Sequence, residues 1–577
     1  MSRALRIAGA GAIALLAACN STDATGNGGP VSPCPGGASP QEVSLAVGHV
    51  RVLGDAASLS CVSLSAPDGG AATYVVVAAN ADPTPDDTGR FVMADSAASL
   101  SAAVHASRLT GAGARPVGAL GAAAALAALA VRDDPEGRIR AMERRVLPLG
   151  RPAGARIEAS VRAATSAATL PALGDTLSFK VPDPNADNAC TTFSTVKSVV
   201  KAIGRHGIIV QDTAAPSGGF TSSDFSAIVQ EFDDAIYPAD TVHFGSPSDI
   251  DGNDHVYLLF TPKVNAATTR GANGVLQGFF FGGDLFPPSQ CAESNQGELF
   301  YLLVPDPQGK FSDARSASSV RQDTRGTIAH EFQHMINEGT RIAENVPGES
   351  VWLNEALSHF AEELVGRDEH GFGDTRELGI ADVADAQNNF ADFNAFFGNN
   401  IVRLRDFLAD TGTIGATSVH ADSSLRVRGA AWSLLRWSAD HFSGGNVAAF
   451  TRALVAGPDT SVDNLLARTG APFDTLMAGW LVANYADDGG ISGLASLDTY
   501  SSWKLREVEA AVNNGVFPLQ PIALGSAAPT TRIVASAAAV YFEVGVDAGG
   551  ARVIGELAPD GGAVTFPGAR MYVLRVR

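Results

Sequence analysis

Hydrophobic and polar positions alternate with the two-residue period of β-strands near both ends of the chain. Apolar runs at 43–47 and 74–79 are separated by turns containing Gly, Asp and Pro. They predict a small β-sandwich-like domain over residues 41–97, with the role of a spacer or interaction module. A similar pattern after the central region predicts a second small β domain over residues 491–577.

The central region, residues 174–490, combines the two-residue period of strands with the period of about 3.6 residues of helices. Strand-like apolar runs come first, at 177–181, 207–210, 256–260 and 299–304. The spacing then becomes helical, because Ile328, Phe332 and Met335 lie on one side of a helix. We therefore expect an α+β fold, in which strands that form a sheet precede a helix and the central region is flanked by the two small β domains.

Residues 98–173 link the first β domain to the central region and are rich in alanine. They contain helical patterns at 120–132 and 138–147, broken by the turn at 134–137. Two interpretations are open, a helical connector or a pro-segment-like cover over a cleft of the central domain. The connector is preferred.

The segment 327–337, Thr-Ile-Ala-His-Glu-Phe-Gln-His-Met-Ile-Asn, carries the candidate chemistry. His330 and His334 are one helical turn apart, so both imidazoles leave the same face and can bind one metal ion. Glu331 is rotated by about 100° on that helix and can reach a water in the metal's open position, where it would act as a general base. A catalytic zinc usually has three protein ligands. Glu355, about twenty residues later at the start of a second predicted helix, can supply the third.

The order H-E-x-x-H followed by N-E-x-x-S resembles the gluzincin metallopeptidases, the thermolysin-like group. The segments His-Glu-Phe-Gln-His-Met-Ile-Asn and Trp-Leu-Asn-Glu-Ala-Leu-Ser-His-Phe-Ala-Glu-Glu are most similar to the hyicolysin-type family. The likeness extends over about residues 175–488, with further similar stretches at 429–442 and 480–488. It implies a thermolysin-like zincin domain at 174–490, with a mixed sheet, an active-site helix and a helical C-terminal half. In this domain His330, His334 and Glu355 would bind one zinc ion and Glu331 would be the catalytic base.

Two related groups fit less well. A metzincin would need Gly and His where this chain has Asn337 and Thr340. A gluzincin aminopeptidase would carry a G-x-M-E-N-type motif upstream, and nothing in residues 275–327 matches it. The sequence therefore favours an endopeptidase.

Ligand histidines normally donate their second ring N–H to a neighbouring acceptor. In thermolysin-like enzymes an Asp four residues after the ligand Glu accepts it, and here that position is His359. Glu362 lies seven residues after Glu355 on the same helical face and is the better candidate. The alternative is that Glu362 and Glu363 are solvated charges on the helix surface.

A hydrolytic site also needs a group that stabilises the oxyanion. The groups available in the helical half are His420, Arg426, Arg428 and His441. Relatives tend to have a Tyr-Gly pair where this chain has Arg428 and Gly429. The role stays open, with His420 and Arg428 as the named candidates.

The amino terminus predicts export. Arg3 and Arg6 precede an apolar run at 7–18 that is too short to span a bilayer and suits the core of a signal peptide, residues 1–18. The ending Leu-Ala-Ala-Cys resembles a bacterial lipoprotein signal, which implies lipidation of Cys19. An ordinary secretory signal is the alternative. Residues 19–40 are rich in Gly, Ser, Thr, Asn and Pro and suit a flexible tether.

Besides Cys19, the chain has four cysteines, an even number suited to an oxidising compartment. Sequence order favours Cys34 with Cys61 and Cys190 with Cys291, although four cysteines permit three pairings. We expect a bacterial cell-envelope protein that is anchored by lipid. By analogy with lipoprotein sorting, Asn20 favours the outer membrane, facing the periplasm or the surface.

The loop 249–254 resembles the start of a calcium loop, with Asp249, Asp251 and Asn253 as possible ligands. It departs from an EF-hand because Asp254 stands at the sixth position and Phe260 at the twelfth, so a polar turn is the other interpretation. The net charge of −20 argues against a nucleic-acid partner.

Together these features predict a membrane-anchored zinc endopeptidase that hydrolyses extracellular or periplasmic proteins or peptides. The alternative is an envelope-binding or adhesive lipoprotein built on an inactive peptidase scaffold. The retention of Glu331 and of all three predicted ligands favours the enzyme.

Overall fold

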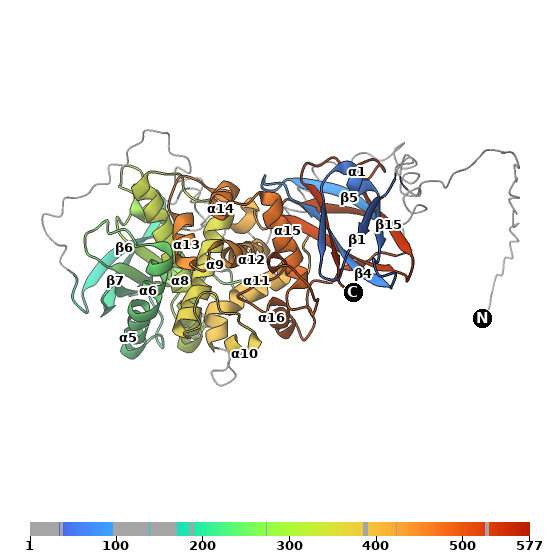
Figure 1. Cartoon of the computed structure of the whole chain (residues 1–577). Helices are drawn as coiled ribbons and strands as arrows, with labels where there is room; N and C mark the ends of the chain where they lie inside the picture. Colours follow the sequence, from blue (N-terminus) through green and yellow to red (C-terminus); the bar gives the residue numbers. More distant parts are fainter. Residues whose placement is uncertain are drawn as a thin grey trace, which may run out of the picture.

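The computed structural model describes residues 34, 39–95, 138, 170–183, 186, 188, 190–272, 274–384, 391–422, 424–525 and 530–577. The predicted signal peptide, Cys19, most of the tether and nearly all of the alanine-rich linker lie outside the described residues. The described part has a β-sandwich at one end, a mixed sheet at the other and helices between them (Figure 1). This arrangement confirms the α+β class.

The sandwich is built from both ends of the described chain, which is why blue and red strands lie in the same sheets in Figure 1. One sheet has the order β1 (Gln41–Ser44), β3 (Val62–Ser65), β15 (Ala551–Leu557), β5 (Thr88–Ala94) and β13 (Thr531–Ala535). The other has the order β12 (Ile522–Ala523), β14 (Ala538–Val546), β4 (Ala72–Asn80), β16 (Ala569–Arg575) and β2 (Val50–Leu53). The short helix α1 (Ala56–Ser60) joins β2 to β3.

The prediction of two separate β domains at 41–97 and 491–577 is therefore wrong. β4 lies between β14 and β16, and it pairs antiparallel with both of them. Each predicted domain supplies five of the ten described strands of one sandwich, and most strand pairs join a strand of one set to a strand of the other.

The central strand β4 is buried on both faces. Tyr74, Val76 and Ala78 point into the sandwich, whereas Val75, Val77 and Ala79 belong to the main core that also contains the helical half. This division follows from the two-residue period of a strand. The sandwich therefore shares its core with the helices and is an integral part of the fold instead of a spacer.

The second sheet has the order β10 (Gly278–Phe280), β11 (Leu299–Leu302), β9 (Val256–Phe260), β8 (Gly207–Asp212), β7 (Phe193–Ile203) and β6 (Thr176–Pro182). β8, β9 and β11 run parallel, and β10 is an antiparallel edge strand. The four predicted runs match β6, β8, β9 and β11. The sequence missed β7 and the three-residue β10.

Two long helices follow this sheet. α8 (Ala317–Glu344) begins at Ser316, whose side chain accepts the Ser319 amide, and it ends at Asn345 in the left-handed conformation. Its apolar positions Ile328, Phe332 and Met335 are fully buried. α9 (Val351–Glu369) packs against it. Both helices were predicted from the apolar spacing.

The remaining helical segments surround these two and cover the sheet. They are α5 (Ser222–Glu231), η2 (Phe232–Ile236), α6 (Tyr237–Phe244), α7 (Pro262–Ala267), η3 (Gly282–Leu285), α10 (Ile380–Val383), η5 (Phe393–Phe397), α11 (Gly398–Leu408), η6 (Val419–Asp422), α12 (Leu425–Phe442), α13 (Val447–Val455), α14 (Ser461–Thr469), α15 (Phe473–Ala486), η7 (Ser496–Asp498) and α16 (Leu505–Val512). Among the described residues, none of these helices combines the length and the hydropathy needed to cross a bilayer.

Both predicted disulfides are present. Cys34 is bonded to Cys61 in the sandwich, and Cys190 is bonded to Cys291 beside the second sheet. The second bond joins residues 101 positions apart. The structure thus selects one of the three possible pairings, the one that sequence order favours.

Candidate metal centre

His330 and His334 are presented by the same face of α8. Their Nε2 atoms lie 3.1 Å apart, and both side chains are buried. The helix places the two rings one turn apart, and the packing of α9 against α8 encloses them. Two ring nitrogens therefore converge on one point in the interior.

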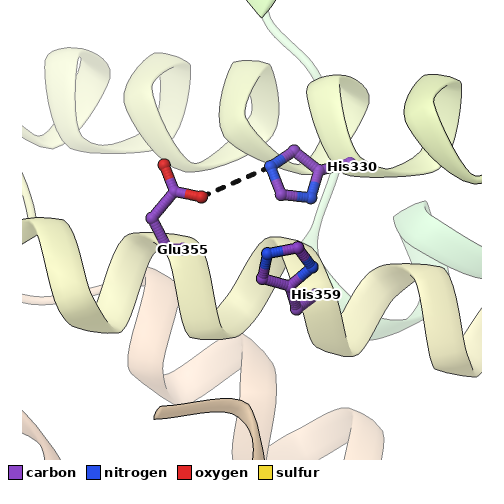
Figure 2. Close-up of side chains that lie close together, drawn as sticks. All are labelled: His330, Glu355 and His359. Atoms are coloured by element: carbon purple, nitrogen blue, oxygen red, sulfur yellow. Dashed lines mark ion pairs between the residues drawn. The ribbon is translucent and has the colours of Figure 1, made fainter. Parts of the chain in front are cut away.

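Glu355 reaches this point from α9, and Figure 2 shows its carboxylate directed toward His330. Its Oε2 atom lies 3.5 Å from His330 Nε2, and its Oε1 atom lies 3.7 Å from His334 Nε2. Ligand atoms on a tetrahedral zinc with bonds of 2.0–2.1 Å are about 3.3 Å apart. The spacing of these three side chains fits a single zinc ion.

The charges of the site also suit a cation. Burial disfavours the ionised form of Glu355, but Arg428 and the two imidazoles hold the pKa of this carboxyl well below its usual range. Burial lowers the pKa of His330, but Glu355 and Glu362 outweigh this effect and raise that pKa to about 10. The two carboxylates thus stay ionised and favour a proton on His330, and a bound metal ion would displace that proton from the ring.

Each of the two histidines has a hydrogen-bond partner at its second ring nitrogen. His330 Nδ1 lies 2.8 Å from Glu362 Oε1, and His334 Nδ1 lies 3.0 Å from Ser358 Oγ. The Ser358 hydroxyl donates in turn to Gln333 Oε1, so it can accept from His334. These acceptors favour a proton on Nδ1 of each ring, so that Nε2, once deprotonated, would be free to bind a metal ion beside Glu355.

His359 could take the place of His334 in an alternative set of metal ligands. One atom from each of His330, Glu355 and His359 lies within 4.8 Å of the others, and Figure 2 shows the three side chains together. However, His359 Nδ1 lies 2.7 Å from Glu362 Oε1, and Arg403 contacts its Nε2. Burial and Arg403 lower the pKa of His359 to about 4, so the ring is neutral. The candidate ligand atoms of His330, His334 and Glu355, at 3.1–3.7 Å, lie closer together than the 4.8 Å limit that describes the set with His359.

Glu331 lies beside the converging ligands and is buried. Its Oε2 atom accepts a hydrogen bond of 2.7 Å from the amide of Phe280, on the edge strand β10. The carboxylate is thereby held between α8 and the sheet. A general base needs such a fixed orientation close to the reacting water.

The structure places two of the four oxyanion candidates, Arg428 and His420, next to Glu355 or its helix, and it engages the other two in contacts with backbone carbonyls. Arg428, fully buried on α12, has its Nη1 atom 3.5 Å from Glu355 Oε2. His420 lies in η6, which packs against α9. In contrast, Arg426 donates to the carbonyl of Asp410, and His441 Nε2 lies 2.9 Å from the carbonyl of Thr499.

The predicted calcium loop forms a different cluster from the one expected. Asp249 and Asp251 converge with Glu298, and the ligand atoms lie within 4.8 Å of one another. Asn253 instead donates Nδ2 to Asp251, and its Oδ1 accepts the His255 amide at 2.6 Å. The pairing of Asp249 with Asp251 agrees with the expectation, whereas Asn253 acts as a turn residue. Calcium at this loop stays a prediction.

Three residues of these sites had no assigned role in the sequence. Ser358 follows Glu355 by three positions, so helical spacing could have placed it beside a ligand. Arg403 on α11 and Glu298 on the loop before β11 carry no local signal, because each meets its partners only through the tertiary fold.

The comparison with known proteins points to the metalloproteases as a class. No family model matches the chain. Over 147 residues it is 31% identical to the neutral metalloprotease ShpI of Staphylococcus hyicus. The aligned stretch covers 25% of this chain and 31% of that relative. The similarity therefore supports metalloprotease ancestry for part of the chain.

Proposed function

We propose that the chain is a zinc-dependent endopeptidase in which His330, His334 and Glu355 hold one zinc ion. The observation that carries this proposal is the convergence of two imidazole nitrogens and one carboxylate within 3.1–3.7 Å at a buried point. Two imidazoles and a carboxylate are a known ligand set of catalytic zinc. The partial similarity to a metalloprotease supports the same reaction class.

Bound zinc would supply a Lewis acid for the peptide carbonyl and would lower the pKa of the attacking water. Glu331 would take the proton of that water and return it to the leaving nitrogen. The hydrogen bond from the Phe280 amide holds this carboxylate during both transfers. Arg428 would keep Glu355 ionised. His420, in the η6 segment that packs against α9, is the group that we propose contacts the developing oxyanion.

The proposed location follows from the amino terminus and the disulfides. Cleavage before Cys19 and lipidation of its thiol would anchor the chain to the bacterial envelope, with the outer membrane as the expected site. The two disulfides suit an oxidising compartment. Substrates would then be extracellular or periplasmic proteins or peptides.

The experiment that tests the function is hydrolysis of casein by zinc-loaded protein from residue 20 onward. Glu331→Gln is the test variant, and Glu338→Gln, two turns further along α8, is its matched control. We expect cleavage by the wild type and the control and a loss of about 10²–10⁴ in rate for Glu331→Gln. Zinc content should be equal in all three proteins.

Failure of the wild type to cleave casein while it retains stoichiometric zinc would contradict a general endopeptidase. Failure to retain zinc would instead favour the alternative, an envelope-binding or adhesive lipoprotein on an inactive scaffold. Zinc retention measured by elemental analysis separates these two results.

A further inference from the structure

The loop between α11 and α12 connects the sandwich to the helices of the candidate site. Its η6 segment packs against α9, the helix that carries Glu355. On the other side, the loop is hydrogen-bonded to the start of β14. The Ala539 amide donates to the Thr411 carbonyl at 3.1 Å, the Thr411 hydroxyl donates to the Ala539 carbonyl at 2.7 Å, and the Ala416 amide donates to the Ala537 carbonyl at 3.2 Å.

Glycine allows this close approach. A Cβ atom at Gly415 would lie 1.6 Å from the carbonyl oxygen of Ser536, so no side chain fits at this position. The loop and the sandwich therefore touch backbone to backbone, and a movement of one displaces the other.

A residue of the amino-terminal half of the sandwich fixes the end of this loop. Asp86, in the turn between β4 and β5, has a φ of 61°, a left-handed conformation that Asp tolerates better than most residues. Its carboxylate accepts hydrogen bonds from the Ser418 hydroxyl and, at 3.1 Å, from the Val419 amide. The Ser418 oxygen also accepts the amide of His420 at 3.1 Å. A continuous chain of hydrogen bonds thus leads from Asp86 to the backbone of His420.

We infer that Asp86 is a positioning residue for His420, so that the amino-terminal part of the sandwich is a component of the catalytic unit. This inference rests on the proposed peptidase function. Hydrogen bonds to a carboxylate are stronger than those between neutral groups, and here two of them hold consecutive residues of one loop. The contact bridges more than three hundred residues of sequence, so it exists only in the assembled fold.

The test compares variants of the zinc-loaded protein from residue 20 onward. Asp86→Gly removes the carboxylate and keeps the left-handed backbone accessible. Asp87→Ala is the matched control, because the neighbouring carboxylate is exposed and accepts the amide of Thr88. Asp86→Asn is the conservative variant, since its single amide oxygen can replace part of the acceptor capacity.

We expect kcat for casein-derived peptides to fall by about tenfold or more in Asp86→Gly, because small displacements of a positioned group are costly in rate. KM, zinc content and the melting temperature should stay close to those of Asp87→Ala. Asp86→Asn should recover part of kcat. Amide hydrogen exchange at residues 416–422 should be faster in Asp86→Gly than in the control.

If the wild type is active and Asp86→Gly has the same kcat, the inference is overturned and the proposed function stands. A wild type without activity would overturn the proposed function, and this inference with it. If Asp86→Gly does not fold, Ser418→Ala decides, since it breaks the same chain of hydrogen bonds. Loss of kcat in that variant supports the inference, and an unchanged kcat overturns it.

Discussion

Oε1 of Glu362 lies 2.8 Å from Nδ1 of His330, so a buried carboxylate one helix away sets the orientation of the first histidine of the motif. The same oxygen lies 2.7 Å from Nδ1 of His359. One carboxylate oxygen thus accepts hydrogen bonds from Nδ1 of both rings and fixes their orientation.

Glu362→Gln should weaken zinc binding by about 10–100-fold, the usual cost of losing such a partner. The amide retains an acceptor oxygen but lacks the charge that favours the protonated Nδ1. Competition with a chelating dye would measure the dissociation constant. Asp368→Asn, an exposed change on the same helix, is the control. Equal zinc affinity in the two variants would contradict the role assigned to Glu362.

Gly326→Ala should destabilise the protein by about 1–3 kcal/mol, the range for overpacking a dense interior. An added Cβ atom would lie 2.0 Å from the carbonyl oxygen of Ala395 and 3.7 Å from Glu362 Oε2. The helices would have to separate near His330. Urea unfolding would measure the difference. Gly545→Ala serves as the control, because nothing lies within 4 Å of its added Cβ; a loss of equal size there would disprove the steric explanation.

Glu556 predicts a pH dependence of stability. This side chain is fully buried in the sandwich, and burial raises its pKa to about 8. Its folded pKa lies above the unfolded value of 4.5. The contribution of this group to the free energy of unfolding is therefore most favourable below pH 4.5 and decreases as the pH rises to about 8. Between pH 5 and pH 8 the decrease is on the order of 3 kcal/mol.

Glu556→Gln should remove this part of the pH dependence, so that the variant becomes more stable than the wild type at pH 8 and not at pH 5. Thermal unfolding at both pH values would measure it. The exposed Glu543→Gln on β14 is the matched control. A variant whose stability changes with pH as steeply as that of the wild type would show that Glu556 is already ionised in the fold.

The two disulfides should differ in their effect on stability. In the chain-entropy model, the cross-link that spans 101 residues contributes about 4.7 kcal/mol and the one that spans 27 residues about 3.5 kcal/mol. Replacement of Cys190 and Cys291 by Ser should therefore cost about 1 kcal/mol more than replacement of Cys34 and Cys61. Denaturant midpoints of the two double variants test this order, and an inverted order would refute it.

Local patterns predicted the features that depend on local geometry. The spacing of His330 and His334 follows from one helical turn, and the apolar stripes of α8 and α9 set the two helices side by side. The strand β10 was missed because three residues are too few to show a period. The amide of Phe280 in this strand nevertheless donates to Glu331, so a contact of the candidate base comes from an element without a sequence signal.

Features that depend on distant pairing were not predictable. The apolar alternation of β4 and of β14 indicates two strands and does not indicate that they are neighbours. The same limit explains Asp86, whose partners Ser418 and Val419 lie in another part of the chain. Burial of both faces of β4 was not predicted, although residues 74–79 form a continuous apolar run, which is typical of a strand in the middle of a structure.

The placement of β4 between β14 and β16 has a consequence for biosynthesis. At 5–20 residues per second, on the order of a minute separates the synthesis of β4 from that of its two neighbours. During this time an apolar strand with two unpaired edges is exposed to other chains. We therefore expect β4 to be prone to pairing with other chains until β14 and β16 have been synthesised.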